Sequence, residues 1–157
     1  MEPIITRPDA ADIEAAAELA VRAWTPIREI FRRDIGDELY EAFFTGWQES
    51  KKAGIREQLS AGRGYVTKLD GKVVGFISYR VDGKIGEIQG NAVDPDCRGM
   101  GLGTAQYRFV LDRMKEEGAE FACVTTGGDD GHAPARRAYE AVGFEAYLPS
   151  RKYFKKL

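Results

Sequence analysis

Residues 93–104 read VDPDCRGMGLGT and place Gly99, Gly101 and Gly103 at alternate positions. A β-rich pattern ends at Val93, and a helical pattern opens inside the glycine run. Glycines let successive backbone N–H groups approach one ligand closely, and a helix N-terminus adds partial positive charge and unpaired donors. The stretch therefore predicts an anion site at a strand-to-helix junction, most naturally for a phosphate or pyrophosphate.

Two familiar phosphate motifs do not fit this loop. A P-loop requires Gly-Lys-Ser or Gly-Lys-Thr, and the sequence contains neither. The dinucleotide fingerprint G-x-G-x-x-G fails at its third glycine, because that position is Gln106 or Thr104. Both motif classes are therefore excluded.

The region before the loop predicts a three-stranded antiparallel meander over 64–69, 72–81 and 84–93. Asp70-Gly71 and Asp82-Gly83 separate these β-rich segments, and Asp-Gly between such segments is a strong hairpin signal. Gly86 and Gly90 in the third segment indicate a bulge or a close approach by a ligand. A short strand at 3–6 is expected to join the sheet.

Residues 9–59 carry helical spacing. Asp9 is placed to cap a first helix that reaches Trp24, and a second helical region spans 26–59 with breaks near Gly36 and Gly54. Apolar and aromatic positions of this second region are expected to lie mostly in the core: Ile30, Phe31, Leu39, Tyr40, Phe43, Phe44 and Trp47.

After the loop the pattern predicts a helix over 101–117, a strand over 121–126, a helix over 133–142 and a closing hairpin from 144–147 and 152–154. Gly118 and Gly143 follow the two helices as stops. The fold class is α+β, with a mixed, mostly antiparallel twisted sheet flanked by helices. At 157 residues, one domain covering 1–157 is expected.

Composition excludes several classes. A net charge of −2 argues against broad nucleic-acid binding, and no apolar run approaches the ~18 residues of a membrane span. One His and two Cys cannot form a usual zinc site, so no metal is expected, and the cysteine usage favours the cytoplasm. Residues 1–60 carry 8 basic and 12 acidic side chains. This excess predicts either ordinary solvated helix faces or an acidic half that faces a cationic ligand.

The residues at this point resemble a known family. Arg98–Gly103, RGMGLG, matches the Q/R-x-x-G-x-G/A signature of the GNAT superfamily of N-acetyltransferases. Residues 135–144, ARRAYEAVGF, resemble the family's A-x-x-x-Y-x-x-x-G-F segment, and the order of elements is similar over nearly the whole chain. The resemblance implies the acyl-CoA N-acyltransferase fold and transfer of an acetyl group from acetyl-CoA to a primary amine by direct attack in a ternary complex.

The resemblance also implies which residues hold acetyl-CoA. In the family the loop backbone binds the pyrophosphate, and the pantetheine arm pairs with the end of the preceding strand like an added strand. The residues implied are Asn91, Ala92, Val93, Arg98, Gly99, Met100, Gly101, Leu102, Gly103 and Thr104. His132 stands where many members have a cofactor-contacting Asn, seven residues before Tyr139, and this departure puts one contact in doubt.

Two residues are candidates for proton transfer. Tyr139 matches the family tyrosine that protonates the departing thiolate, and a phenol with a pKa near ~10 stays protonated at neutral pH. Glu87 matches the carboxylate that some members use as general base. The structural alternatives are a packed tyrosine and a strand carboxylate that pairs with Arg80 or Lys72. Gln89, two residues after Glu87, is expected to orient substrate or water.

In the family the end of the first helix walls the acceptor site, which makes Trp24, Arg28 and Phe31 candidate substrate contacts. Helical packing explains Trp24 and Phe31 equally well. The acceptor is a small-molecule or peptide amine of open identity, and a homodimer is left open. The alternatives are a CoA-binding sensor or interaction module with little turnover, and a nucleotide-binding regulator. Four other residues are expected to take no part in the chemistry: Cys97 is incidental, Cys123 lies in the core, and Arg136 and Arg137 are solvated.

Overall fold

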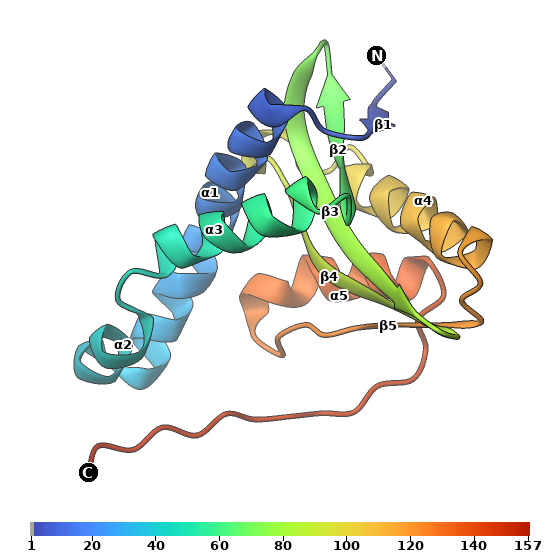
Figure 1. Ribbon diagram of the computed structural model, residues 1–157. Coiled ribbons are helices and arrows are strands. Elements are labelled where there is room, and N and C mark those ends of the chain that lie inside the picture. Colours follow the sequence, from blue (N-terminus) through green and yellow to red (C-terminus); the bar gives the residue numbers. More distant parts are fainter. Residues whose placement is uncertain (1) are drawn as a thin grey trace.

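The computed structural model describes residues 2–157, in which five strands form one twisted sheet with helices on both faces (Figure 1). The sheet order follows the chain: β1 (Ile4–Thr6), β2 (Gly64–Leu69), β3 (Lys72–Asp82), β4 (Ile85–Val93) and β5 (Phe121–Val124). The first four strands pair antiparallel, and β4 and β5 pair parallel. The mixed, mostly antiparallel sheet predicted from the sequence is confirmed.

Tight turns connect the meander. Asp70 and Gly71 lie between the paired residues Leu69 and Lys72, with φ angles of 50° and 77°. Two consecutive positive φ angles match the right-handed twist of a hairpin, and Asp-Gly adopts them readily. The next turn comprises Gly83 and Lys84, one residue later than the Asp-Gly pattern predicts.

A β-bulge interrupts the β3–β4 ladder at Gln89. Ser78 pairs with Gly90 and Tyr79 pairs with Ile88, so Gln89 has no partner on β3. The bulge predicted from Gly86 and Gly90 is therefore present beside Gly90. Gly86 has a different reason, because a Cβ there would lie 2.5 Å from the Met114 sulfur. The close approach at Gly86 is made by a helix.

Helices α1 (Ala10–Ile35) and α3 (Trp47–Ser60) cover one face of the sheet, and α2 (Asp37–Phe44) packs against α1 away from the strands (Figure 1). Asp9 and Asp12 form a capping box at the start of α1, as the cap position predicts. The expected division of this region is partly wrong. Helix α1 continues through Pro26, and Gly54 lies inside α3, whereas the chain does break at Gly36 and again at Gly46, where φ is 78°.

The aromatic residues of this half divide between core and surface. Tyr40 and Trp47 are buried as expected, but Phe43 is 53% exposed and Phe31 and Phe44 are half-buried. The expectation that most of them are core is therefore wrong. These residues sit at the end of the helical layer farthest from the sheet, so less protein covers them.

The other face of the sheet carries α4 (Leu102–Glu116) and α5 (Ala133–Ala141). Short 3₁₀ turns precede each helix, η1 (Pro95–Cys97) and η2 (Asp130–His132). The core is consequently divided by the sheet. Leu19, Leu59 and Phe76 belong to the cluster under α1 and α3, and Tyr107 and Met114 belong to the cluster under α4 and α5.

The end of the chain overturns one expectation. Residues 142–157 contain no strand, so the closing hairpin is wrong. The tail crosses from α5 to α2 in an extended path (Figure 1). Its end is fixed by aromatic contacts, since the Phe154 ring lies 4.9 Å from Phe43 and 6.1 Å from Phe44. Without a hairpin beside it, β5 is an edge strand. Cys123 is exposed there and is not a core residue.

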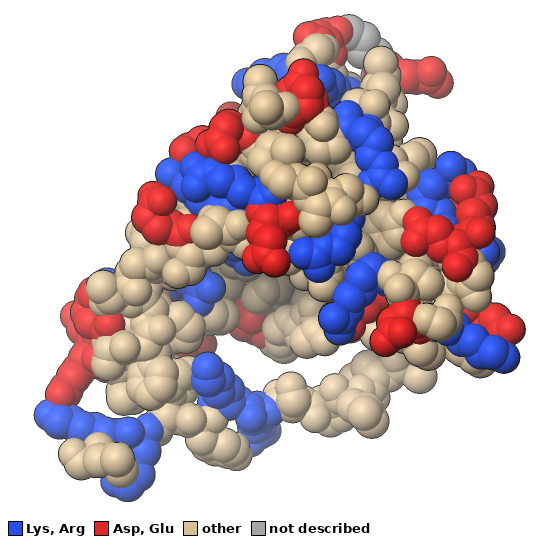
Figure 2. Space-filling view, in the orientation of Figure 1, with Lys and Arg blue, Asp and Glu red and all other residues tan. Residues whose placement is uncertain are grey.

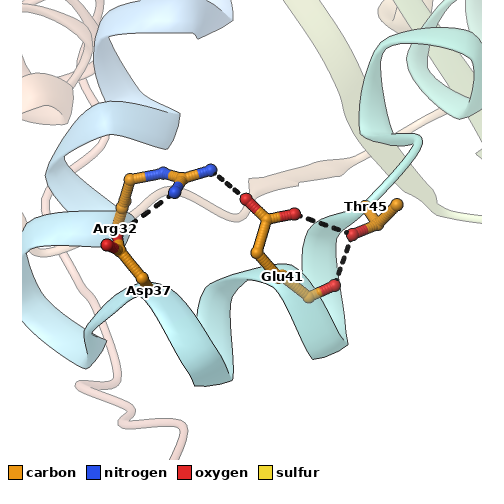
Figure 3. A network of polar contacts seen from close by, with 4 residues as sticks. All are labelled: Arg32, Asp37, Glu41 and Thr45. Carbon is orange, nitrogen blue, oxygen red and sulfur yellow. Dashed lines mark hydrogen bonds and ion pairs between the residues drawn. The ribbon is translucent and has the colours of Figure 1, made fainter.

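A polar network joins the end of α1 to α2 (Figure 3). Arg32 donates to the carboxylates of Asp37, at 3.1 Å, and Glu41, and Glu41 accepts from the Thr45 hydroxyl. Exposed ion pairs add little to the free energy of folding. The network links the last turn of α1 to α2.

Within the described range 2–157, no helix is both long and apolar enough to cross a membrane. The same residues hold no group of three His, Cys, Asp or Glu side chains arranged for a metal ion.

Candidate active site

The glycine loop begins at an anchored carboxylate. The Asp94 N–H donates to the Val74 carbonyl at 2.7 Å, and the Asp94 carboxylate accepts from the Asp96 N–H at 3.0 Å and from Arg22 at 2.8 Å. Burial alone would raise the pKa of Asp94, but these hydrogen bonds and the Arg22 charge lower it below its usual value. An ionised, buried Asp94 thus ties the loop to α1 and β3.

Two loop glycines adopt a backbone that other residues rarely adopt. Gly99 and Gly101 have φ angles of 78° and 74°, and no heavy atom lies within 4 Å of the position that a Cβ would take in either. A Cβ at Gly103 would make only an ordinary contact, 3.9 Å from a Val93 methyl group. The loop is therefore shaped by its glycines and open on the side where their side chains would stand.

The N-terminus of α4 has unfilled donors. No side chain caps the helix at Gly101, and its first turn contains no acidic residue. Arg98 is exposed and forms no ion pair with any residue of 2–157. Unpaired N–H groups, the helix dipole and a free guanidinium together favour an anion at this point. The strand-to-helix junction predicted from the glycine run is therefore present between β4 and α4.

Beside the loop, one edge of β4 is unpaired. The parallel ladder with β5 ends at the pair Ile88–Val124, whereas β4 continues to Val93. On its other edge β4 stays paired with β3 through Val93. The β5-side edge of β4 is therefore free at residues 91–93, and an extended ligand can pair there with the backbone groups of alternate residues.

Tyr139 points its hydroxyl at this part of β4. It donates to the Asn91 side-chain oxygen at 3.2 Å, and the Asn91 amide donates to the Tyr107 hydroxyl at 2.6 Å. The two tyrosine rings are 4.7 Å apart. Burial raises the pKa of both Tyr139 and Tyr107 above the usual phenol value. Each hydroxyl is consequently protonated at neutral pH.

The bulge brings Asn91 to these tyrosines. Ile88 packs in the cluster under α4 and α5, and strict alternation would place a residue three positions later on the opposite face. The extra residue Gln89 restores the same face for Asn91, which explains its contact with Tyr107. Sequence reasoning named Asn91 for its backbone and missed this use of its side chain.

A cavity of about 440 Å³ lies on the other face of β4, between the bulge and the three helices α1, α2 and α3. Figure 2 shows the surface hollowed below α3 and above the C-terminal tail. Aromatic side chains form much of the wall: Trp24, Phe43, Phe44 and Trp47. Both tryptophans of the chain therefore line this cavity.

Three of the predicted acceptor residues meet there, namely Trp24, Arg28 and Gln89. Phe31 stands behind the wall, 5.6 Å from the Phe44 ring. Glu87 does not line the cavity, because its carboxylate accepts from Arg80, its cross-strand neighbour, at 3.0 Å. This is the ion-pair alternative for Glu87 considered from the sequence.

Sequence reasoning missed Lys51, Trp47 and Phe44 as cavity residues. The Lys51 ammonium lies 3.7 Å from the centre of the Trp24 ring. Burial, together with the smaller effect of the Arg28 charge, lowers the pKa of Lys51 to about 8. The signal in the sequence was a lysine that follows several aromatic residues, but such a segment is equally typical of a helix packed in the core.

The acidic excess of residues 1–60 does not face the cavity. Its carboxylates form ion pairs elsewhere: Glu14 with Arg56, Glu18 with Lys52 and Glu41 with Arg32. No Asp or Glu lies among the cavity-lining residues in the described range. The alternative in which this half faces a cationic ligand is wrong for this cavity, and the solvated-face alternative agrees with the structure.

The loop before α5 is held by its own side chains. His132 Nδ1 lies 2.6 Å from Asp129 Oδ1, and Arg136 donates to the carbonyls of Gly127 and Asp129 at 2.6 and 2.8 Å. The expectation of a solvated Arg136 is wrong, because these carbonyls bind its guanidinium. The side chain of His132 is 17% exposed, and its ring is committed to Asp129.

Comparison with known proteins supports a family assignment. Residues 24–144 match the model of the acetyltransferase (GNAT) family. Mycothiol acetyltransferase of Sanguibacter keddieii is 37% identical over 91 residues, 54% of this chain and 28% of that protein. The uncharacterized N-acetyltransferase MJ1530 of Methanocaldococcus jannaschii is 49% identical over 91 residues, 58% of each chain. The chain thus spans 28% and 58% of the length of these two relatives.

Solved structures share the architecture. The PaiA N-acetyltransferase of Thermoplasma acidophilum, in complex with coenzyme A, has a TM-score of 0.77 at 16% identity, covering 96% of this chain and 94% of that one. Aminoglycoside acetyltransferase AAC(6')-Iy, in complex with a CoA bisubstrate analogue, has a TM-score of 0.68 at 17% identity over the full length of both. Identities this low establish the fold. Together with the match over residues 24–144, they establish that the chain belongs to the GNAT acetyltransferase family.

Proposed function

We propose that residues 1–157 act as one domain, an N-acetyltransferase that moves an acetyl group from acetyl-CoA to a primary amine by direct attack in a ternary complex. One observation carries the proposal. The uncapped N-terminus of α4 and the aromatic cavity both meet β4, within the five residues from Gln89 to Val93. A donor bound on one side and an acceptor on the other would meet at this strand.

The donor side suits acetyl-CoA. The open loop of Arg98–Thr104 would hold the pyrophosphate through backbone N–H groups, with Arg98 adding charge. The free edge of Asn91, Ala92 and Val93 would pair with the pantetheine amides. His132, already bonded to Asp129, would contact the cofactor through its remaining ring edge.

In the reaction the amine nitrogen forms a bond to the acetyl carbon, and the carbon–sulfur bond breaks. The departing thiolate takes the proton of the Tyr139 hydroxyl, and solvent reprotonates Tyr139. The attacking nitrogen loses one proton, through water, toward Glu87, whose carboxylate is partly exposed beside Arg80. Gln89 would orient the amine from the cavity wall, with Trp24, Arg28 and Phe31 around the rest of the acceptor.

The ion pair between Glu87 and Arg80 favours a second candidate, a CoA-binding sensor with little turnover, because it holds the proposed base away from the cavity. For either candidate we infer a cytoplasmic setting, which the two unpaired cysteines, Cys97 and Cys123, support.

Two measurements test the proposal. Acetyl-CoA should raise the melting temperature of the protein by mass action, and Gly101→Asp should abolish this effect by placing a carboxylate where an anion binds. Gly118→Asp is the matched control, because Gly118 also has a positive φ but lies at the other end of α4. Equal stabilisation of both variants by acetyl-CoA would remove the donor assignment.

The second measurement is release of free CoA across a panel of amines, with acetylated products identified by mass. Release with at least one amine is expected. Stabilisation by acetyl-CoA with no release from any amine would favour the sensor.

A further inference from the structure

The cavity beside the bulge contains two cations and no counter-ion. Arg28 and Lys51 line it, both half-buried, and neither forms an ion pair with any residue of 2–157. Elsewhere in the same helices the basic side chains are paired, as Lys52 with Glu18 and Arg56 with Glu14 show. The unpaired state is therefore a property of the cavity and not of this layer as a whole.

Aromatic rings support both cations without neutralising them. The Arg28 guanidinium lies 4.9 Å from the centre of the Phe44 ring and 5.2 Å from that of Trp47, and Lys51 lies over Trp24. Ring faces stabilise a cation and leave its hydrogen-bond donors free. One such donor, Nε of Arg28, is buried and has no partner. A buried donor without a partner lowers the free energy of unfolding, unless a ligand accepts a hydrogen bond from it.

The β4 wall of the cavity differs in polarity from the helical wall that carries Arg28 and Lys51. The side-chain oxygen of Gln89 is buried and has no hydrogen-bond partner. It stands on the bulge of β4, next to the free strand edge where the acetyl group of the donor would lie. An amide oxygen accepts from an N–H group. The cavity thus offers an acceptor near β4 and positive charge toward α1 and α3.

We propose that the acceptor is a small amino acid or related amino carboxylate, whose amine lies at Gln89 and whose carboxylate binds Arg28 and Lys51. This inference rests on the proposed function and names the substrate class of that site. A cavity of about 440 Å³ fits a small molecule. A planar carboxylate also matches the fork of a guanidinium, which an isolated amine does not.

The proposal predicts a pH dependence of binding. The Lys51 ammonium faces the Arg28 guanidinium on α1, and the titratable phenol of Tyr40 on α2 lies beside Arg28. With no carboxylate present, the pKa of Lys51 is lowered to about 8. A bound carboxylate would favour the ammonium form, so binding above this pH should take up a proton and weaken as pH rises.

Both tryptophans line the cavity, so tryptophan fluorescence reports binding without requiring turnover. The test titrates the protein with matched acids and amides, β-alanine against β-alaninamide and glycine against glycinamide, and adds a dipeptide ending in a free carboxylate. Saturable changes are expected with the two amino acids and much weaker ones with the amides. Tighter binding of the dipeptide would overturn the assignment to a small amino acid.

Charge variants sharpen the test. Arg28→Gln and Lys51→Gln should each weaken carboxylate binding by about 10–100-fold, the usual worth of a charged hydrogen bond. Lys51→Arg should retain binding. Lys52→Gln is the matched control, because Lys52 pairs with Glu18 outside the cavity, and it should bind as the parent does.

The outcomes separate the two proposals. Amides that bind and are acetylated as well as the acids, or a preference for diamines, would overturn the carboxylate site and leave the acetyltransferase proposal intact. Carboxylate binding that depends on Arg28 and Lys51 supports the carboxylate site, whether or not CoA is released. A lack of CoA release would count only against the proposed acetyl transfer.

Discussion

The two sides of β4 are built from different material. On the proposed donor side the groups available for binding are mostly backbone, presented by the glycines of residues 99–103 and by an unpaired strand edge. On the acceptor side they are side chains contributed by α1, α2, α3 and β4. A backbone site needs particular residue types at fixed spacing, whereas a side-chain cavity uses common residues brought together by folding. The first therefore leaves a motif in the sequence, and the second does not.

The largest expected effect tests whether the donor side also carries chemistry. Tyr139→Phe keeps the ring and removes the hydroxyl that contacts Asn91. The kcat of acetyl transfer should fall by about 10²–10⁴, the usual contribution of one acid–base group, while KM for acetyl-CoA changes much less. Steady-state kinetics of CoA release measures both.

Tyr79→Phe is the control for that variant, since Tyr79 is equally buried but its hydroxyl donates to Glu117. A Tyr139→Phe rate within threefold of the parent would mean that water protonates the thiolate.

The next effect isolates the acceptor side. Gly54 lines the cavity from α3 and has no heavy atom within 4 Å of its Cβ position, so Gly54→Leu should fill part of the cavity. KM for the acceptor should rise by about tenfold or more, the range expected for losing well-packed contacts. Stabilisation by acetyl-CoA should stay unchanged in the same thermal melts.

Ala53→Leu, on the exposed side of the same helix, should leave both quantities unchanged. Loss of acetyl-CoA binding in Gly54→Leu would mean that the two sites are not separable.

A smaller effect concerns the anchor of the glycine loop. Asp94→Asn removes a buried charge paired with Arg22 and should lower the free energy of unfolding at neutral pH by about 1–3 kcal/mol. Because folding lowers the pKa of Asp94, its contribution is present above the unfolded pKa of ~3.9 and is lost as pH falls. Urea denaturation should therefore show a gap between parent and variant that narrows below that pH. A gap independent of pH would contradict the assigned role of the charge.

The smallest effect is a gain. Gly54 lies in the interior of α3 with an ordinary helical backbone, so Gly54→Ala should raise the free energy of unfolding by about 1 kcal/mol. Thermal or urea denaturation of this variant measures it. A decrease would indicate that the open space at Gly54 is needed for the packing of α3 as well as for the cavity.

Most of the sheet could be predicted from the sequence because its signals are local. Asp70-Gly71, the glycine run and Gly118 each fix a backbone conformation where they stand. The helical half was divided less well, because a proline such as Pro26 and a glycine such as Gly54 are tolerated in helices when tertiary packing compensates.

The tail and the cavity lay outside the reach of local patterns. The end of the chain follows Phe154 to the aromatic residues of α2, a contact between residues more than a hundred positions apart. Trp47 and Phe44 are aromatic residues of a helical region, and nothing in their spacing distinguishes a cavity wall from a core. The roles assigned to Tyr139, Glu87 and the loop residues remain predictions for the experiments above.

The bulge at Gln89 means that β4 carries one residue more than its partner strand requires. If Gln89 were instead paired in a regular ladder, the Asn91 amide would point into the apolar layer under α1 and Ala92 would point out of it. Burying the Asn91 amide and exposing Ala92 is costly, so the bulge stays before Asn91. Deleting Gln89 would instead keep Asn91, Ala92 and Val93 on their present faces. The sheet should survive that shortening, and the cavity would lose its amide oxygen.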